Sequence, residues 1–390
     1  MDDTSRVPGQ VTRIVLLTEI PAPFRNEPFS ALAAEQGIDL HVLFLAEADP
    51  RRSYRLYPEE MRFAWRVLPG RGFMRGGFWA VANLGVLGAL LRLRPDVVVV
   101  GGWNQPAFWQ AALYAKVLRR PLVTWVESTA RDRRRGRGPL ELAKRAILAA
   151  SAAFLVPGRA SADYVRSLGI APSRVVVAPN AVDASIFGEG VAAALPRRDE
   201  LRRALGLTRF TALYVGRLAP EKGLAALLAA VRELDLDVVL VGSGPLAAEL
   251  RAAAPANVRL AGQVDRDGLV RWYAAADAFV LPSNSEPWGM VLNEAAAAGL
   301  PIVASEAAGA AWDLVDDGVN GYRFPAGDSG ALASALARVA GDPGLRAGAR
   351  VRSRQLASAH SAAAWAGAVA ALARQLATGQ AATVPPSTRR

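Results

Sequence analysis

The stretch TALYVGRLAPEKGLAALLAAVRELDLDVVLVGSG, residues 211–244, decides the fold. It contains two short apolar runs, Thr211–Val215 and Val238–Val241, and each of them ends at a glycine. Between these runs, Gly223–Leu234 has the length and the alanine- and leucine-rich composition of a helix. A strand, a helix and a second apolar strand form a βαβ unit with parallel strands covered on both faces. The stretch therefore predicts an open α/β sheet that binds ligands beyond the ends of its strands.

The same alternation of short apolar runs and longer helical segments extends through the chain. The runs are apolar almost throughout, which is typical of parallel strands buried on both faces. Because 390 residues are about twice the usual length of one domain, we predict two doubly wound α/β domains. The other predicted strands are Arg13–Leu17, Leu40–Phe44, Phe63–Val67, Val97–Val100, Leu122–Trp125, Phe154–Val156, Val175–Val177, Val258–Ala261, Ala278–Leu281, Ile302–Ser305 and Gly321–Phe324.

Glycines and a proline within Phe187–Asp199 interrupt this pattern and mark a domain boundary. We predict a first Rossmann-like domain over residues 1–187 and a second over residues 188–357. An alanine-rich amphipathic helix at 358–377 is expected to pack back on the first domain, and 378–390 are expected to form a disordered tail. If the carboxyl ends of the two sheets face each other, the cleft between the domains is the natural active site.

The composition excludes several kinds of site. The chain has no cysteine and only two histidines, His41 and His360, which excludes disulfides, thiolate metal sites and multi-histidine metal sites. The longest apolar stretch, Phe78–Leu91, has 14 residues. It is shorter than the roughly 20 residues that span a bilayer, so we predict a helix of a soluble domain there. No signal-peptide pattern is visible at the polar N-terminus, and we therefore expect a cytoplasmic protein.

The net charge of +11 is concentrated in the first half of the chain. Residues 1–190 contain 25 basic and 17 acidic side chains, whereas residues 191–390 contain 21 and 18. Such an excess is compatible with nucleic acid, an anionic membrane surface or an acidic substrate. Arginines alternate with aromatic residues over Arg51–Trp79, and an arginine cluster covers Arg131–Arg137. These two stretches form either a solvated face or a surface for anionic lipid, which would make the protein peripheral on the cytoplasmic face of the membrane.

Two glycine-containing turns of the second half follow predicted strands directly. In the first turn, Gly216 is followed by two cations, Arg217 and Lys222, the second of which lies where a helix begins. Helix N-termini attract phosphate groups, and arginine offers a bidentate fork to them. In the second turn, Gly242 and Gly244 allow the backbone to approach a ligand closely. Taken alone, the first turn is equally compatible with an ordinary solvated loop, and the second is a weak signal because most such turns are only turns.

The segment PSNSEPWGMVLNEA, residues 282–295, is the most informative of the chain. Pro287 and Gly289 place Glu286 in the loop after a strand, and Glu294 lies about a turn into the following helix. Two carboxylates that point into one cleft are suited to a sugar, because a carboxylate accepts both hydrogens of a vicinal diol. Free N–H groups at the start of the helix suit a phosphate. The alternative is an ordinary loop acid with a helix-cap acid.

Together these segments resemble glycosyltransferase family 4, whose members have the two-domain GT-B fold. The resemblance covers nearly the whole second half. Its most specific part is the order Glu-Pro-Trp-Gly-Met-Val-Leu-Asn-Glu-Ala over residues 286–295, followed by Ala298–Ala304 and Asp316–Gly321. Pro179–Asp183 is similar to the family's segment before the hinge, with Ala181 where glycine is common. The first half matches more loosely.

The resemblance implies a role for each matching residue. Arg217 and Lys222 would bind the donor diphosphate and stabilise charge on the leaving group. Glu286 would contact the transferred sugar, and Glu294 would hold the ribose hydroxyls. The donor-binding candidates are Gly216, Gly242, Gly244, Val264, Gly289, Met290, Val291 and Glu294.

The implied activity is that of a retaining glycosyltransferase. It would move a hexose-type sugar from a UDP- or GDP-sugar to a glycan or lipid-linked acceptor, in cell-surface polysaccharide or glycolipid synthesis. The family uses no metal and no cofactor besides the nucleotide-sugar donor. Two Asp-x-Asp triplets, 235–237 and 265–267, are not expected to bind metal. The first precedes a strand at its N-terminal edge, and the second caps a helix.

The first half is expected to bind the acceptor. Many relatives carry a histidine on its catalytic face, and this chain departs from that pattern. Glu127 stands there instead, after the strand Leu122–Trp125, and is a fourth catalytic candidate beside Arg217, Lys222 and Glu286. Further acceptor-side candidates are Trp103, Asn104, Arg131 and Arg133.

Two other functions are compatible with parts of the pattern. A sugar-nucleotide epimerase of GT-B architecture would bind the same donor, but its usual catalytic acids and histidine are not evident. A basic nucleic-acid-binding protein would explain the charge, but no recognised nucleic-acid-binding motif is present. We therefore expect no nucleic-acid partner.

Overall fold

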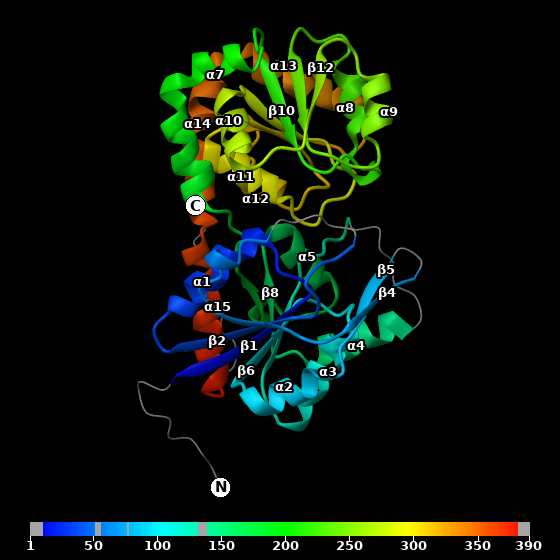
Figure 1. The fold of residues 1–390 in the computed structure, drawn as a ribbon, viewed down its shortest axis with the longest axis vertical. Helices are drawn as coiled ribbons and strands as arrows, with labels where there is room; N and C mark the ends of the chain where they lie inside the picture. Colours follow the sequence, from blue (N-terminus) through cyan, green and yellow to red (C-terminus); the bar gives the residue numbers. More distant parts are fainter. Residues whose placement is uncertain (1–10, 51–55, 76–77, 132–138, 381–390) are drawn as a thin grey trace.

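The computed structural model describes residues 11–50, 56–75, 78–131 and 139–380. Two α/β domains lie one above the other in Figure 1, with the first domain below and the second above. The strands are β1 Thr12–Thr18, β2 Ile38–Phe44, β3 Ala64–Val67, β4 Arg71–Arg75, β5 Phe78–Ala82, β6 Val97–Val100, β7 Leu122–Trp125, β8 Ala153–Val156, β9 Val175–Val177, β10 Thr211–Val215, β11 Asp237–Val241, β12 Val258–Gly262, β13 Ala278–Leu281, β14 Ile302–Ser305 and β15 Gly321–Phe324.

The helices of the first domain lie between its strands along the chain, and the second domain repeats the arrangement. The α-helices are α1 Asn26–Ala34, α2 Val86–Leu93, α3 Pro106–Val117, α4 Pro139–Ala150, α5 Arg159–Ser167, α6 Val191–Ala194, α7 Arg198–Ala204, α8 Leu224–Val231, α9 Ala247–Ala253, α10 Arg266–Ala275, α11 Met290–Ala298, α12 Ala311–Leu314, α13 Ser329–Gly341, α14 Pro343–Ala359 and α15 Ala362–Ala377. Short 3-10 turns include η2 Pro58–Glu60 and η6 Pro220–Lys222, and η4 Ser185–Gly190 is a π-helix.

Each domain has one large parallel sheet. The strand order is β3-β2-β1-β6-β7-β8-β9 in the first domain and β12-β11-β10-β13-β14-β15 in the second. The order reverses beside β1 and again beside β10, which makes these two strands the switch points where open α/β sheets bind ligands. The prediction of two doubly wound parallel sheets is therefore confirmed, and each predicted strand of the sheets is present within two residues at either end.

The predicted helix over Phe78–Leu91 is wrong in its first part. Phe78–Ala82 forms strand β5, which pairs antiparallel with β4 as a hairpin beside the first sheet, and only Val86–Leu93 is helical. The apolar run is compatible with either structure. Its pairing with Arg71–Arg75, together with the burial of Trp79 and Val81 in the first-domain core, selects the strand.

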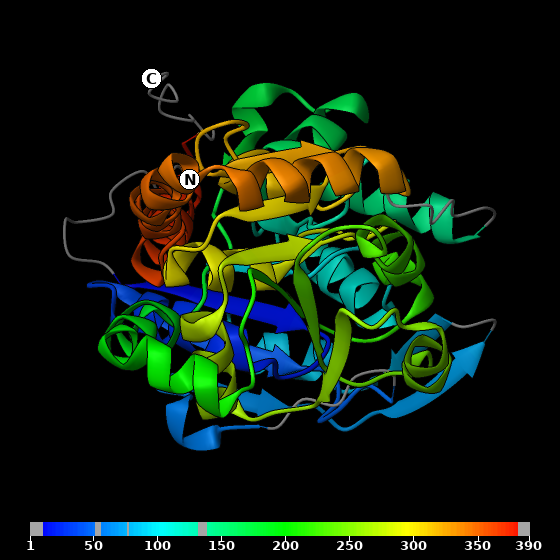
Figure 2. The same ribbon diagram turned by 90° about the horizontal axis from the view of Figure 1, so that it is seen from above.

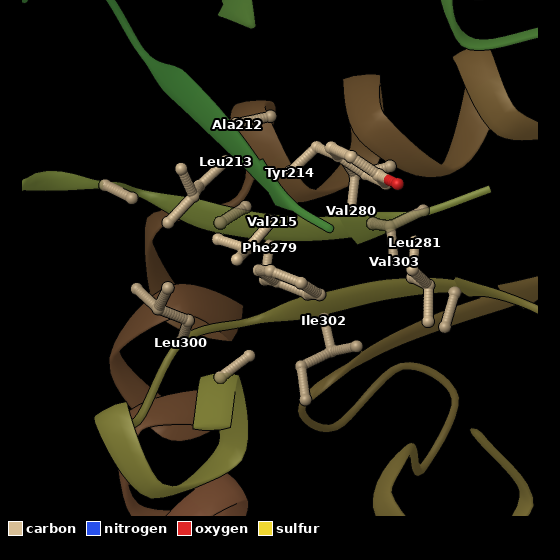
Figure 3. Close-up of a cluster of buried hydrophobic side chains, with 14 of the residues drawn as sticks. Ala212, Leu213, Tyr214, Val215, Phe279, Val280, Leu281, Leu300, Ile302 and Val303 are labelled. Atoms are coloured by element: carbon tan, nitrogen blue, oxygen red, sulfur yellow. The ribbon is translucent and has the colours of Figure 1, made fainter. Parts of the chain in front are cut away.

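The central strands are buried on both faces, as their apolar composition predicts. In Figure 3, side chains of β10, β13 and β14 point to both sides of the second sheet, among them Leu213, Phe279 and Val303. In the first sheet, all four valines of Val97–Val100 are buried. Burial of one such side chain stabilises the fold by about 1.5–3 kcal/mol, so these strands anchor the loops that follow them.

The last helix, α15, lies against the first domain although it follows the second in the chain. In Figure 1 it runs beside α1, and Trp365 packs its ring 5.5 Å from that of Phe29 and 5.4 Å from that of Trp125. Ser361 begins the helix by accepting a hydrogen bond from the Ala364 amide. The stretch Pro343–Ala377 has the length and mean hydropathy of a membrane span, but core helices of globular domains meet the same test.

The loops at the carboxyl ends of the two sheets meet at the domain junction. Arg131 donates to the carbonyl of Glu306 at 2.9 Å, and Asn293 donates to the carbonyl of Asn180 at 2.8 Å. A Cβ atom on Gly309 would lie 3.4 Å from Thr129. In the view from above, the second domain covers much of the first (Figure 2). The tail expected at 378–390 lies, from 381 on, outside the described residues.

Candidate active site at the domain junction

Glycines after β10 and β11 bring two backbone turns into direct contact. Gly242 has φ 141°, and a Cβ there would lie 1.9 Å from the carbonyl oxygen of Gly216. A Cβ on Gly244 would lie 2.3 Å from the carbonyl oxygen of Leu218, whose amide donates to Ser243 at 2.8 Å. Any side chain at these glycines would push the turns apart. The predicted donor residues Gly216, Gly242 and Gly244 therefore form one continuous backbone surface.

The two predicted cations lie on the loop that joins β10 to α8. Lys222 ends the turn η6, and Gly223 follows it in the left-handed region, with φ 66°. A Cβ on Gly223 would lie 2.0 Å from the carbonyl oxygen of Pro282, so the loop after β10 packs against the loop after β13. This contact brings Lys222 into an ion pair with Glu286, 64 residues away in the chain.

Arg217 has a different environment from Lys222. Its guanidinium is about half exposed and pairs with Glu221 at 3.3 Å, whereas the side chains of Lys222 and Glu286 are both largely buried. The carbonyl of Glu221 in turn accepts hydrogen bonds from the amides of Asn284 and Ser285. An exposed arginine is free to reorient toward a ligand phosphate, while the lysine is already held in place.

The loop from Glu286 to Gly289 is fixed by its own backbone. The Glu286 carbonyl accepts from the Gly309 amide at 3.0 Å, and the Trp288 carbonyl accepts from Ala310 at 2.9 Å. Gly289 adopts φ 97° and begins α11. The first N–H groups of a helix, here those of Met290 and Val291, have no partner within the helix and point at whatever lies beyond its end. Predicted donor residues thus lie at a helix N-terminus next to Lys222 and Glu286.

Glu294 lies one turn further along α11 and bonds to Tyr273 of α10. The Tyr273 hydroxyl donates to the Glu294 carboxylate at 2.7 Å. Burial raises the pKa of Glu294 to about 7, and the Tyr273 hydrogen bond offsets part of this rise. Burial, followed by the nearby Glu294 charge, raises the pKa of Tyr273 well above its usual range. Glu294 is thus a carboxylate with one hydrogen-bonding partner and with capacity for further donors.

Val264 lies at the outer side of the same site. It is partly buried against the second-domain core, and its side chain would meet a Cβ on Gly268 at 2.9 Å. Next to it, Ser243 donates to Gln263 at 3.0 Å, which joins the turn after β11 to the turn after β12. Tyr273, Ser243 and Gln263 were missed in the sequence. In the sequence, Ser243 and Gln263 differ from other polar residues only because each follows a predicted strand.

Glu127, the acceptor-side candidate, is held by two residues from distant segments. Asn180 donates to one of its carboxylate oxygens at 3.2 Å, and Arg25 lies 3.5 Å from the other. Arg25 also donates to Thr18 at 2.5 Å and lies over the Trp125 ring at 4.5 Å. The sequence contained no signal for Arg25 or Asn180 as partners, because they lie 102 and 53 residues from Glu127 along the chain.

A second carboxylate of the first domain, Glu27, was also missed. It is on α1, and one of its oxygens is buried without a hydrogen-bonding partner among the described residues. Burial, and then the nearby charge of Asp183, raise its pKa to about 7 although Arg62 acts in the opposite direction. A carboxyl group with this pKa lies close to Arg25 and the hinge segment, on the acceptor side of the junction.

The remaining acceptor-side candidates have partners of their own. Asn104 donates to the Glu19 carboxylate at 2.9 Å, and the ring of Trp103 lies 5.3 Å from the Lys144 ammonium. Arg131 lies over the Trp312 ring at 4.7 Å and bonds to the Glu306 carbonyl, so it bridges the domains. Arg133 is outside the described residues.

The two Asp-x-Asp triplets have other roles. Asp235 and Asp237 form ion pairs with Arg209 at the N-terminal edge of β11. Asp265 caps α10 by accepting from the Gly268 amide at 2.9 Å. Within the described residues, no group of three or more histidine, aspartate or glutamate side chains is arranged to hold a metal ion.

Two family models match the chain, one in each domain. Residues 29–186 match Glycosyltransferase Family 4, and residues 209–342 match Glycosyl transferases group 1. The chain is 33% identical to a D-inositol 3-phosphate glycosyltransferase of Xylanimonas cellulosilytica over 69% of its length and 70% of that protein. It is 31% identical to a glycogen synthase of Mycobacterium tuberculosis over 73% of its length and 70% of that protein.

Among solved structures, the fold matches that of Anabaena HepE in complex with UDP and glucose, with a TM-score of 0.70. The match has 20% identity and covers 92% of this chain and 98% of that one. The two α/β domains thus form a GT-B fold, and the predicted architecture is confirmed. The protein belongs to glycosyltransferase family 4, and it transfers a sugar from a nucleotide sugar.

Proposed function

We propose that the protein is a retaining hexosyltransferase that uses a UDP-sugar and delivers the sugar to a phosphate-bearing or lipid-linked glycan acceptor. The observation that carries the donor half is the contact of Lys222 with Glu286 beside the N-terminus of α11. A cation, a carboxylate and free helical N–H groups lie together there, as a sugar diphosphate requires. UDP is favoured because the HepE structure contains it.

In this proposal the donor loop stabilises the leaving group without a metal ion. As the anomeric C–O bond breaks, negative charge develops on the diphosphate and positive charge on the sugar. Lys222 and Arg217 balance the first charge, together with the amides of Met290 and Val291. Glu286 accepts hydroxyl hydrogens of the sugar, and Glu294 accepts those of the ribose. Glu127 orients the incoming acceptor hydroxyl.

A panel of nucleotide sugars tests the donor. A ligand that binds only the native state raises the free energy of unfolding, by about 2.7 kcal/mol when its concentration is 100 times its Kd. The melting midpoint rises as a result. We expect UDP-glucose or another UDP-hexose to raise the midpoint, whereas GDP- and dTDP-sugars raise it less. The same shift should disappear in Lys222→Ala. A larger shift with a GDP-sugar would contradict the assignment of uridine but not the proposed site.

An acceptor panel tests the second half of the proposal. The names of the matched relatives favour a phosphorylated polyol or a glucan, and the arginines of the first domain favour an anionic group. We expect UDP release to accelerate with inositol 3-phosphate or a polyprenyl-phosphate glycan more than with neutral maltooligosaccharides. Faster release with the neutral acceptors alone would overturn the preference for an anionic acceptor.

We also propose that the first domain rests on an anionic membrane from the cytoplasmic side. Helices α3 and α4 carry exposed apolar side chains, Leu113, Val117 and Leu142, and they also carry the exposed cations Lys116 and Arg145. Apolar side chains that enter the headgroup region and cations that bind anionic lipid are the features of interfacial helices.

Sedimentation with liposomes tests this surface. We expect binding to vesicles that contain phosphatidylserine at low salt, and little binding to neutral vesicles. The double variant Leu113→Glu/Val117→Glu should lose it. Val351→Glu, at an equally exposed valine of the second domain, is the matched control and should retain it. Equal binding by both variants would place the membrane surface elsewhere.

A further inference from the structure

A chain of three hydrogen bonds crosses the domain junction and ends at Glu127; the first two are buried and the last is partly buried. Trp288 donates from Nε1 to Oδ1 of Asn293 at 2.8 Å. Asn293 donates from Nδ2 to the carbonyl of Asn180 at 2.8 Å, and Asn180 donates from Nδ2 to the Glu127 carboxylate at 3.2 Å. The last residue of this chain, Glu127, also lies 3.5 Å from Arg25.

The direction of this chain follows from chemistry. An indole nitrogen only donates a hydrogen bond, so the Asn293 oxygen must face Trp288. The Asn293 amide nitrogen is then left to face Asn180, where a backbone carbonyl can only accept. Asn180 in turn must present its own amide nitrogen to a carboxylate. Each bond therefore has one possible polarity, and the Asn293 amide cannot flip without leaving buried polar groups unpaired.

Burial makes this chain selective for one domain arrangement. Asn293 is 1% exposed, Trp288 4% and Asn180 7%. Several hydrogen bonds join the two domains within the described residues, but those of Arg131, Arg159 and Arg266 are exposed or only partly buried. The bond from Asn293 to Asn180 is fully buried. A buried unpaired amide or carbonyl costs about 1–3 kcal/mol, so the two groups are either paired or separated into water.

The donor end of the chain is part of the donor site. Trp288 lies between Glu286 and Gly289, and Asn293 directly precedes Glu294 on α11. Adjacent helical residues point about 100° apart, so Asn293 faces the first domain while Glu294 faces Tyr273. A ligand that orders the loop and the start of α11 therefore also fixes the positions of Trp288 and Asn293, whose hydrogen bonds lead to Asn180.

We propose that Asn293 and Asn180 are positioning residues that make the orientation of Glu127 depend on the closed, donor-loaded arrangement of the two domains. This inference rests on the proposed acceptor-side role of Glu127. When the domains separate, Asn293 leaves Asn180, and Asn180 loses the contact that fixes its backbone beside Glu127. Glu127 then faces the incoming hydroxyl correctly only when the donor loop is docked, which limits attack by water on a half-assembled site.

The variant Asn293→Asp tests the chain with minimal change of shape. The aspartate can still accept from Trp288, but its second oxygen would face the Asn180 carbonyl without a hydrogen. We measure UDP release from UDP-glucose, or from the sugar that the donor panel selects, and donor affinity by calorimetry. We expect kcat to fall about 10–100-fold, with the donor Kd changed less than about threefold. An equal loss in donor affinity would mean that Asn293 serves the donor site alone and would overturn the proposal.

Asn320→Asp is the matched control for the cost of altering a buried asparagine. Asn320 is fully buried, accepts from the Asp316 amide and donates to Leu314 and Ser353, all within the second domain. It should lower the melting midpoint as Asn293→Asp does but leave kcat within about threefold. A matching loss of kcat in this control would assign the effect to general destabilisation.

Asn180→Ala tests the hydrogen bond between Asn180 and Glu127 separately. It also replaces the first test if the Asn293→Asp variant does not fold. It keeps the backbone carbonyl that accepts from Asn293 and removes only the amide that faces Glu127. We expect the same fall in kcat at unchanged donor affinity. Combined with Asn293→Asp it should cost no more than the slower single variant, because both act through one carboxylate.

Glu127→Gln separates failure of this inference from failure of the proposed role. If Glu127→Gln alone retains near-normal turnover, the role of Glu127 is wrong. If it slows turnover and its effect multiplies with that of Asn293→Asp, Glu127 acts but the chain does not control it. If the double variant is no slower than Glu127→Gln, the chain acts through Glu127 as proposed.

Discussion

The two domains share one fold but build their halves of the site differently. In the second domain, much of the proposed donor surface is backbone, namely the turns at Gly216, Gly242 and Gly289 and the first amides of α11, to which side chains such as Lys222 and Glu286 are added. In the first domain, Glu127 depends on two side chains from distant segments, Arg25 and Asn180. A backbone site keeps its shape whatever the neighbouring side chains are, whereas a side-chain site changes with any one of them. The turns of the second domain are thus fixed by glycines next to the strands, whereas the position of Glu127 is fixed by residues distant in the chain.

The largest effect is expected at the donor end. Lys222→Ala should lower kcat about 10²–10³-fold, because one cation on the leaving diphosphate is lost and Glu286 stays partly buried without its partner. Arg217→Ala should cost less, because its guanidinium is half exposed. Steady-state UDP release measures both. Arg209→Ala, at a cation far from the junction, should leave the rate unchanged; a loss there would point to general effects of charge.

A smaller loss of about 10²-fold is expected for Glu127→Gln, which keeps the shape of the side chain but removes its charge. Donor affinity should not change, since Glu127 contacts Asn180 and Arg25 rather than the donor loop. Calorimetry with UDP-glucose and initial rates at saturating donor check the two statements separately. A weakened donor affinity would contradict the proposal that the second domain alone binds the donor and the first domain binds the acceptor.

The titration of Glu294 should make the affinity for the nucleotide-sugar donor depend on pH. Its pKa of about 7 in the free protein means that it is largely protonated at pH 6 and ionised at pH 8. The ribose hydroxyls donate best to the ionised form, so the Kd for UDP-glucose should decrease from pH 6 to pH 8. The diphosphate of a UDP-sugar does not titrate in this range. Glu294→Gln should bind about tenfold more weakly at pH 8 and show no such slope. A slope retained in the variant would assign it to another group.

The same raised pKa predicts a cost in stability. A folded-state pKa above the usual 4.5 means that the folded protein loses stability as pH rises from about 4.5 to 7. Without ligand, Glu294→Gln should therefore be more stable than the natural protein at pH 8, by up to about 3 kcal/mol. The difference should vanish near pH 4.5. Thermal melts at both pH values check this sign.

The smallest effect is expected at a contact that joins the two domains without involving Lys222, Glu286 or Glu127. Arg266 of α10 forms an ion pair with Glu60 and lies over the Tyr57 ring at 3.9 Å. The hydrogen bond from Arg266 lowers the pKa of Glu60. Arg266→Ala should change kcat less than about threefold and lower stability by up to about 1 kcal/mol, with less effect at high salt. A loss of activity comparable to that of Lys222→Ala would make this contact part of the catalytic closure.

Much of the fold could be predicted because parallel strands covered on both faces are recorded locally, as apolar runs that end at glycines. The hairpin β4–β5 was missed because its local sequence does not show that its two strands pair. Its second strand, Phe78–Ala82, is apolar like a buried helix, and only its pairing with Arg71–Arg75 distinguishes the two. The close approach of the turns after β10 and β11 was predictable because it demands glycine at fixed positions, as at Gly216 and Gly242.

Sequence alone determined the two sheets, the family and the order of the donor segments, because each of these depends on residues that are near one another in the chain. Only the tertiary structure decided that Lys222 meets Glu286, that Tyr273 bonds to Glu294, and that Arg25 and Asn180 converge on Glu127. The partners in these pairs lie 21 to 102 residues apart, and hydrogen bonds act over about 3 Å. No local pattern records such distances; the packing of elements within each domain creates them.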